Sequence, residues 1–272
     1  MSINSLKVFR LFVLLTIACL LSTGMSFAVV LQGDFVGAWL FDEGNGLKAK
    51  SLAGKVGDGS LNGGAKWVPG KISNAISFDG KDGYVEMSLP EIFNNIPNNS
   101  FTITYWLNAK DIAGSGTTWT RILEARNDST NYLQFDIQIN NGELGINLVS
   151  EGTESTFIVN TPIIDSIWYY VTGTWDAKQK AVKLYLNGVL QTGKGTTPAS
   201  PGDKKTLNIG RRSDGTAETY FEGIIDEFAI LSKALTEDEI KSLMKDGLKP
   251  YVAVLSLDKL STMWGNLKSK NN

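Results

Sequence analysis

The 272-residue sequence contains no histidine and a single cysteine, Cys19. Histidine is the general base of Ser-His-Asp and Cys-His catalytic groups and a common ligand of zinc and iron, so its absence excludes these sites. One cysteine supplies neither a disulfide framework nor an iron–sulfur cluster. Oxygen ligation of metals, hydrogen bonding and stacking on aromatic rings are the chemistry that remains.

The first 28 residues are predicted to be a secretory signal peptide. Lys7 and Arg10 precede an apolar run over residues 11–21, which has the length of a signal-peptide core and is too short to span a bilayer comfortably. Small residues lead up to Ala28, where cleavage is predicted. Two alternatives stay open, a lipoprotein anchored at Cys19 and a signal anchor retained in the membrane.

Removal of this segment takes away two of the 26 basic residues and none of the 28 acidic ones. The mature chain is therefore slightly acidic, and it has no basic cluster of the kind that binds nucleic acid or anionic lipid. It also has no apolar stretch long enough to cross a membrane. We expect a secreted protein, extracellular or periplasmic, without membrane insertion after signal cleavage.

Short segments rich in β-branched and aromatic residues recur about every ten positions, separated by Gly, Asn, Asp or Pro. Predicted strands cover residues 36–41, 75–78, 84–87, 101–107, 122–125, 133–139, 144–148, 169–175, 182–186, 189–192, 207–209 and 221–230. One helix is predicted: Thr236 and Glu239 form a capping box, and Gly247 ends the helix. The pattern indicates an all-β fold, a two-sheet antiparallel β-sandwich (jelly roll) with one short C-terminal helix.

Six sequence motifs occur in a fixed order. They are WLFDEGNG at 39–46, PG at 69–70 with NAISFDG at 74–80 and YVE at 84–86, FTITYW at 101–106, WYYVTGTW at 168–175, KLYLNG at 183–188 and GIIDEFAI at 223–230. Together they resemble the laminin-G-like domains of the concanavalin A-like lectin/glucanase superfamily. The resemblance covers residues 35–247 and leaves a C-terminal tail at 248–272. It implies a jelly roll that acts as a recognition module in secreted or surface proteins, often with bound calcium.

The superfamily also contains glucanases and polysaccharide lyases, so paired catalytic carboxylates are the feature to look for. A retaining glycosidase needs two facing carboxyl groups, whereas the strand around Asp136 offers one acid between amides. Glu222 and Asp226 share a face of another strand but lie about 13 Å apart. Residues 121–126 faintly resemble a lyase strand, but that chemistry resembles a His/Tyr pair and the histidine is missing. Arg121, Glu124 and Arg126 are instead expected to form a solvated strand edge.

Acidic residues in two turns are candidate calcium ligands, because a chain without histidine must use oxygen donors. The first turn contains Asp42 and Glu43, and the resemblance implies Asp226 as their partner, since a calcium ion in the superfamily often ties the first strand to the last. The second turn contains Asp79 and Asp82. An Asx-type turn that caps its own backbone is the alternative that needs no ion.

A sugar site needs aromatic faces for stacking and amides or carboxylates for hydrogen bonds to hydroxyl groups. Most tryptophans lie inside strand patterns and are expected to be core residues. The candidate ligand-binding residues are Trp119, Trp67, Tyr132 and Tyr220, which lie in or beside polar loops, and Gln134, Asp136 and Gln138, which share one face of a strand. Loop packing of Trp119 and cross-strand hydrogen bonding of the three polar residues are the structural alternatives.

The sequence thus predicts a secreted, non-catalytic recognition module that binds carbohydrate and holds a structural calcium ion. A protein-binding or adhesion module of the same fold is the alternative, and a glycan hydrolase or polysaccharide lyase is the third. The expected partner is an extracellular or cell-surface glycan, or a secreted or surface protein, and no nucleic acid. The tail at 248–272 contains a weakly amphipathic stretch that either packs on the sandwich or engages another protein.

Overall fold

The computed structural model describes residues 29–54, 56–88, 99–110, 119–128, 131–138, 142–150, 153–195, 206–213 and 220–252. The predicted signal peptide (1–28) and residues 253–272 of the predicted tail lie outside these ranges. For parts of β9 to β12, including Trp119 and the candidate residues of β10, the description extends to the backbone alone. Within the described residues no helix is long and apolar enough to cross a bilayer.

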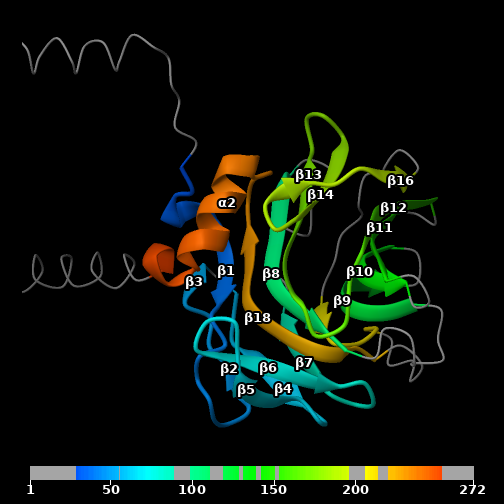
Figure 1. The fold of residues 1–272 in the computed structure, drawn as a ribbon. Coiled ribbons are helices and arrows are strands. Elements are labelled where there is room, and N and C mark those ends of the chain that lie inside the picture. Colours follow the sequence, from blue (N-terminus) through cyan, green and yellow to red (C-terminus); the bar gives the residue numbers. More distant parts are fainter. Residues whose placement is uncertain are drawn as a thin grey trace, which may run out of the picture.

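The described strands form two antiparallel sheets of nine strands each, which confirms the predicted all-β sandwich (Figure 1). Sheet A contains β1 (Phe35–Trp39), β3 (Ala53–Gly54), β5 (Lys66–Pro69), β6 (Asn74–Asp79), β8 (Phe101–Ala109), β13 (Trp168–Asp176), β14 (Ala181–Leu186), β15 (Val189–Leu190) and β18 (Glu222–Leu231). Sheet B contains β2 (Lys48–Ala49), β4 (Gly59–Asn62), β7 (Tyr84–Ser88), β9 (Trp119–Asp128), β10 (Asn131–Gln138), β11 (Glu143–Ser150), β12 (Thr153–Pro162), β16 (Gly193–Gly195) and β17 (Thr206–Ile209).

The main core is filled by one set of alternate positions on each sheet, as the two-residue period of a strand requires. Trp39 and Trp175 are fully buried there, as the strand pattern predicts, and the ring of Trp39 lies 5.6 Å from that of Phe228. This core leaves one outer face on each sheet.

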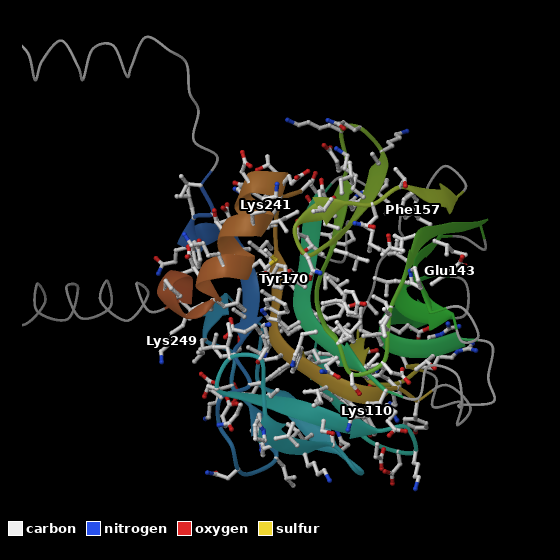
Figure 2. The ribbon with its side chains drawn as sticks, in the orientation of Figure 1. Lys110, Glu143, Phe157, Tyr170, Lys241 and Lys249 are labelled. Atoms are coloured by element: carbon white, nitrogen blue, oxygen red, sulfur yellow. The ribbon has the colours of Figure 1, made fainter. Side chains whose placement is uncertain are left out.

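Helix α2 (Glu237–Asp246) covers part of the outer face of sheet A, beside β1 and β18 (Figure 1). Small residues in the sheet, Ala38 and Ala229, pair across these two strands and let the helix approach closely. The apolar side of α2, with Ile240 and Leu243, packs into a second hydrophobic cluster that includes Tyr170 (Figure 2). A one-turn 3₁₀ helix, η1 (Gln32–Asp34), precedes β1.

The ends of α2 match the predicted capping signals. The amide of Glu239 donates to Thr236 Oγ1 at 3.4 Å, and the amide of Thr236 donates to Glu239 Oε2 at 2.9 Å. Gly247 closes the helix with a φ of 69°, in the left-handed region that glycine favours.

Strand β18 changes its neighbour halfway along its length, and we call this place the strand fork. Its first half, to Ile225, pairs with β6, and its second half, from Phe228, pairs with β1. The pairing with β8 is irregular between Asp226 and Ala229, and Glu227 has a φ of 50°. The fork therefore takes Glu227 out of the regular ladder, directly after Asp226, which still pairs with Trp106 of β8.

Candidate functional site

Five of the seven predicted ligand-binding residues lie on one pair of neighbouring strands, β9 and β10. The register pairs Trp119 with Gln138, Arg121 with Asp136, Glu124 with Gln134 and Arg126 with Tyr132. Register is set by the pairing of the whole sheet, so sequence spacing alone does not reveal these neighbours. The structure thus brings the predicted tryptophan, tyrosine and three polar residues onto adjacent strands.

A row of polar positions continues from this pair across sheet B. The row runs through Lys48, Ser60, Glu86, Asn208, Glu124, Gln134, Asn147 and Thr156. Neighbouring strands lie about 4.8 Å apart, so eight positions span about 34 Å. The adjacent positions Val85, Leu207 and Leu123 are fully buried in the main core, which places this row on the outer face.

Glu124 lies in the middle of the row and is completely buried. Its Oε2 accepts a hydrogen bond of 2.6 Å from the amide of Ser213, and Ser213 Oγ accepts one of 3.0 Å from Asn208 Nδ2. The expectation of a solvated strand edge is wrong for Glu124, because β9 lies between β10 and β17 in the sheet and the segment after β17 folds over it. Its carboxylate anchors that segment.

Arg211 belongs to the same segment, and three side-chain contacts fix its guanidinium group. Its guanidinium lies 3.4 Å from the centroid of the Tyr84 ring, and its Nε donates to Asn208 Oδ1 at 3.2 Å. Its Nη2 is 3.6 Å from the half-exposed carboxylate of Glu86. Stacking and hydrogen bonding fix the flat cation beside the polar row, an arrangement that no local sequence pattern signals.

The strand fork brings together two of the predicted calcium ligands, Asp42 and Asp226. The amide of Ile72 donates to Asp226 Oδ2 at 2.9 Å, and the amide of Asn74 donates to Asp42 Oδ1 at 3.3 Å. Both carboxylates are therefore tied to the same turn between β5 and β6. Glu43 faces another way, since its Oε1 accepts the amide of Lys50 at 2.7 Å.

Burial dominates the electrostatics of the fork. It raises the pKa of Asp226 to about 7, against backbone hydrogen bonds that lower it, and the nearby Asp42 carboxylate adds to the rise. Burial likewise raises the pKa of Glu227 to about 8, against the hydrogen bond from the Leu248 amide. Glu227 Oε1 is buried without a hydrogen-bond partner. The fork is thus a buried, oxygen-rich site with more acidic groups than its hydrogen bonds satisfy.

The backbone beside the fork contains several left-handed residues that are not glycine. Phe41 has a φ of 60°, Ser73 of 56° and Glu227 of 50°. Such conformations cost of order 1–3 kcal/mol each and persist where the surrounding structure imposes them. In the described part of the chain no three acidic side chains converge in the manner of a metal site. A calcium ion between Asp42 and Asp226 would therefore also need carbonyl or water oxygens, which calcium accepts readily.

The second predicted calcium turn has the geometry of a self-capping loop. Asp79 Oδ1 accepts the amides of Lys81, Asp82 and Gly83 at 2.9–3.2 Å. Burial raises the pKa of Asp79, but these backbone hydrogen bonds outweigh it and hold the pKa below its usual value. Asp82 Oδ1 accepts the amide of Gly64 at 2.8 Å. These contacts agree with the Asx-type alternative, and an ion here stays a prediction.

The other two predicted sugar contacts lie away from β9 and β10. Trp67 is on β5 of sheet A, and its Nε1 donates to the carbonyl of Gly46 at 2.8 Å. Tyr220 is half-buried and lies two residues before the start of β18. The structure does not unite either residue with the polar row.

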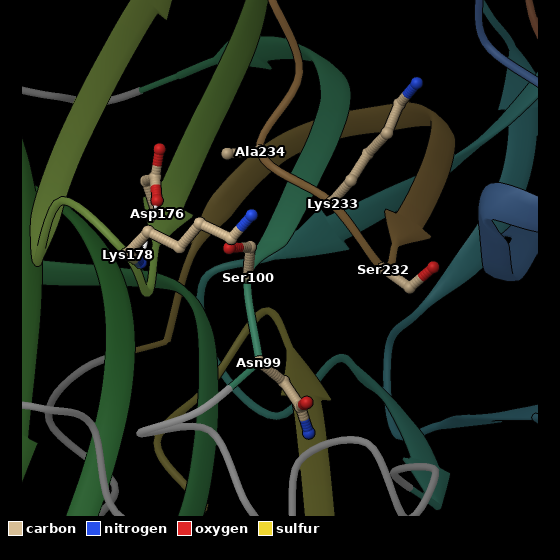
Figure 3. Close-up of a pocket in the computed structure, with 7 residues that line it drawn as sticks. All are labelled: Asn99, Ser100, Asp176, Lys178, Ser232, Lys233 and Ala234. Atoms are coloured by element: carbon tan, nitrogen blue, oxygen red, sulfur yellow. Dashed lines mark hydrogen bonds between the residues drawn. The ribbon is translucent and has the colours of Figure 1, made fainter.

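A shallow open pocket of about 530 Å³ lies where β8 begins and where β13 and β18 end (Figure 3). Its lining residues are Asn99, Ser100, Asp176, Lys178, Ser232, Lys233 and Ala234, none of them aromatic. Lys233 pairs with Asp34 at 3.0 Å and with Glu239 at 2.6 Å. The lining offers no ring for stacking on a sugar, which favours the outer face of sheet B as the candidate site.

Comparison with known proteins gives a family and several relatives. Residues 79–241 match a laminin G-type family model described as the concanavalin A-like lectin/glucanases superfamily. Pentraxin-related protein PTX3 of Mus musculus is 23% identical over 185 residues, which are 65% of this chain and 46% of that protein. The chain thus spans less than half the length of this relative.

Among solved structures, domain 4 of AbnA, an extracellular arabinanase of Geobacillus stearothermophilus, was determined with arabinotriose. It has a TM-score of 0.60 and 21% identity, and the match covers 78% of this chain and 98% of that one. The binding domain of botulinum neurotoxin DC, solved with rat synaptotagmin II, has a TM-score of 0.63 and 16% identity over 80% of this chain and 52% of that one. At these identities the likeness establishes the fold.

Proposed function

Because the chain belongs to the concanavalin A-like lectin/glucanase superfamily, we propose that it is a secreted, non-catalytic module whose outer face of sheet B binds carbohydrate. The observation that carries this proposal is the register of β9 and β10, which pairs Trp119 with Gln138 and Arg121 with Asp136. An aromatic residue beside amides and charged groups is the composition that a sugar ring requires. A structurally similar domain is known with arabinotriose bound.

The environment of the acids supports binding over catalysis. A retaining glycosidase needs two carboxyl groups about 5–5.5 Å apart that both reach the substrate. Glu124 is completely buried and hydrogen-bonded to the Ser213 amide, so it is withheld from any ligand. Asp136 is the register partner of Arg121 and not of a second acid.

The test is binding of the mature chain to an array of immobilised glycans, with Trp119→Ala as the probe. Loss of a stacking tryptophan is expected to weaken binding by at least tenfold, about 1.4 kcal/mol. Trp67→Ala is the matched control and should leave binding unchanged, because the Trp67 ring lies on sheet A and packs against the main core. Equal loss in both variants, or polysaccharide cleavage that Asp136→Asn abolishes, contradicts the proposal.

We further propose that the strand fork holds a structural calcium ion with Asp42 and Asp226 as ligands. An ion there would neutralise buried carboxylates whose pKa values burial raises. Millimolar calcium is expected to raise the melting temperature, since extracellular sites bind at about 10⁻⁴–10⁻³ M. Asp226→Asn should remove the response and Asp82→Asn, in the self-capping loop, should keep it. If Asp82→Asn removes the response and Asp226→Asn keeps it, the calcium site lies in that loop instead.

A protein-binding module is the alternative that one comparison favours, because the neurotoxin domain of similar fold was solved with synaptotagmin II. Absence of any glycan signal, together with a partner captured only when residues 253–272 are present, would support this alternative.

A further inference from the structure

The outer face of sheet A continues beyond the part that α2 covers. A row of paired positions there crosses five strands, and its members are Lys66, Ser77, Ile224, Asn108 and Trp168. Lys66 is exposed, and Ser77, Ile224 and Trp168 are partly exposed. This row, the sheet A row, is on the opposite sheet from the polar row of sheet B.

Two buried polar atoms at the sheet A row have no hydrogen-bond partner. Trp106 and Asn108 are each 8% exposed, and neither Trp106 Nε1 nor Asn108 Oδ1 is bonded. They stand two residues apart on one face of β8, about 6.6 Å along the strand. Thr104, the next position on the same face, is satisfied by Thr172 Oγ1 at 2.9 Å. An unmade hydrogen bond costs about 1–3 kcal/mol, so an orphan donor and an orphan acceptor on the same face of β8 need an explanation.

Aromatic side chains neighbour these two residues, since Trp106 belongs to the second hydrophobic cluster and Trp168 packs against it. Trp168 is the register partner of Asn108, and Tyr170 is the register partner of Trp106. The rings of Trp106 and Tyr170 lie 5.0 Å apart at 60°. Lys71 Nζ lies 4.7 Å from the centroid of the Trp106 ring, and Lys71 is exposed. A flexible, solvated lysine is a cover that a ligand can displace at little cost.

We propose that Trp168, Asn108 and Trp106 form a second carbohydrate-binding site, on the face of the sandwich opposite to the first. A sugar hydroxyl both donates and accepts, so neighbouring hydroxyls on one ring satisfy Asn108 Oδ1 and Trp106 Nε1 together, while the ring stacks on Trp168. A hydrocarbon or a simple cation satisfies only one of these groups or neither. The module is then bivalent and bridges two glycan chains. The ligand class rests on the proposed function, whereas the site is independent of β9 and β10.

The test follows the tryptophan indole N–H signals of the ¹⁵N-labelled mature chain during titration with arabinotriose and with the best oligosaccharide from the array. The chain contains seven tryptophans, and Trp106→Phe and Trp168→Phe assign the signals of two of them. We expect the Trp106 and Trp168 signals to shift on titration and to keep shifting in Trp119→Ala. Calorimetry should give two sites in the wild type and one in Trp168→Ala, with Trp67→Ala as the control. Lys71→Ala, which uncovers the ring, should bind as well as the wild type or up to a few-fold more tightly.

Three outcomes separate this inference from the proposed function. A single site that Trp119→Ala abolishes, with the Trp106 signal unmoved, leaves the proposed function standing and overturns the second site. A single site that only Trp168→Ala or Trp168→Phe abolishes supports the second site and overturns the β9–β10 proposal. No shift with any sugar, and an ordered water on Trp106 Nε1 in a crystal structure, overturns the second site.

Discussion

The strands of both sheets alternate between core-facing and outward-facing residues, but the outward-facing residues of the two sheets differ in kind. On sheet A the row Ala53, Ala38, Ala229, Thr104 and Thr172 is small or self-bonded, and α2 packs beside it. On sheet B the corresponding row is built from amides, acids and hydroxyls. The face that carries small residues is covered by the chain's own helix. The polar face of sheet B is covered at Glu124 and Asn208 by the short segment after β17.

The largest loss of stability is expected when the residue that anchors α2 on sheet A is shortened. Leu243 is 1% exposed within the cluster between α2 and the sheet. Leu243→Ala is expected to cost about 3 kcal/mol, because it removes buried area and leaves a cavity. Urea unfolding measures the change, with exposed Lys245→Ala as the control at about zero. An equal effect of both variants would show that α2 does not depend on that face.

The strand fork adds a pH dependence that the rest of sheet A does not share. Asp226 and Glu227 have folded pKa values of about 7 and about 8, above their unfolded values. Their contribution is complete below about pH 4 and is lost as the pH rises through 7 and 8. Without calcium, the free energy of unfolding should fall as the pH rises from 5 to 9. Asp226→Asn with Glu227→Gln should flatten the profile, and an unchanged slope contradicts the assignment.

On the outer face of sheet B, substitution of the buried Glu124 is the corresponding test. Glu124→Ala leaves the Ser213 amide without its acceptor and should cost about 2 kcal/mol. Glu86→Ala, at a half-exposed position of the same row, should cost less than about 0.5 kcal/mol. Thermal melts of the two variants compare them directly. If they melt together, Glu124 is not the anchor that its burial indicates.

The smallest effect concerns the start of α2. Thr236→Ala removes the side-chain acceptor of the Glu239 amide and should cost about 1 kcal/mol. Thr236→Ser, which keeps the hydroxyl, should restore most of the loss. Far-ultraviolet circular dichroism during melting provides the measurement.

Local signals predicted the parts of the fold that local chemistry determines. The capping box located α2, and the long apolar segments located β8 and β13. β12 escaped prediction because the apolar run in its sequence, TESTFIVNTP, is only three residues long, and the segment extends as a strand through pairing with β11. The predicted strand at 36–41 is longer than β1, which ends at Trp39 before the left-handed Phe41.

The candidate site depended more on tertiary pairing. The sequence selected Trp119 and Gln138 separately, but their adjacency comes from the β9–β10 register. Trp168, the first residue of β13, is partly buried and packs against the second hydrophobic cluster, a position that its local sequence does not specify. The burial of Glu124 follows from a segment that folds back 89 residues later. Contacts of this range leave no periodic trace in the sequence.

The central position of β18 also has a consequence for biogenesis. β1, near the start of the described chain, pairs with β18, with Phe35 opposite Leu231. β6 and β8 also pair with β18. Sheet A cannot close until this late segment has been synthesised. Its folding should therefore be slow, because β18 pairs with three strands from the first half of the chain. A chain truncated before β18 should stay protease-sensitive even though most of its strands are present.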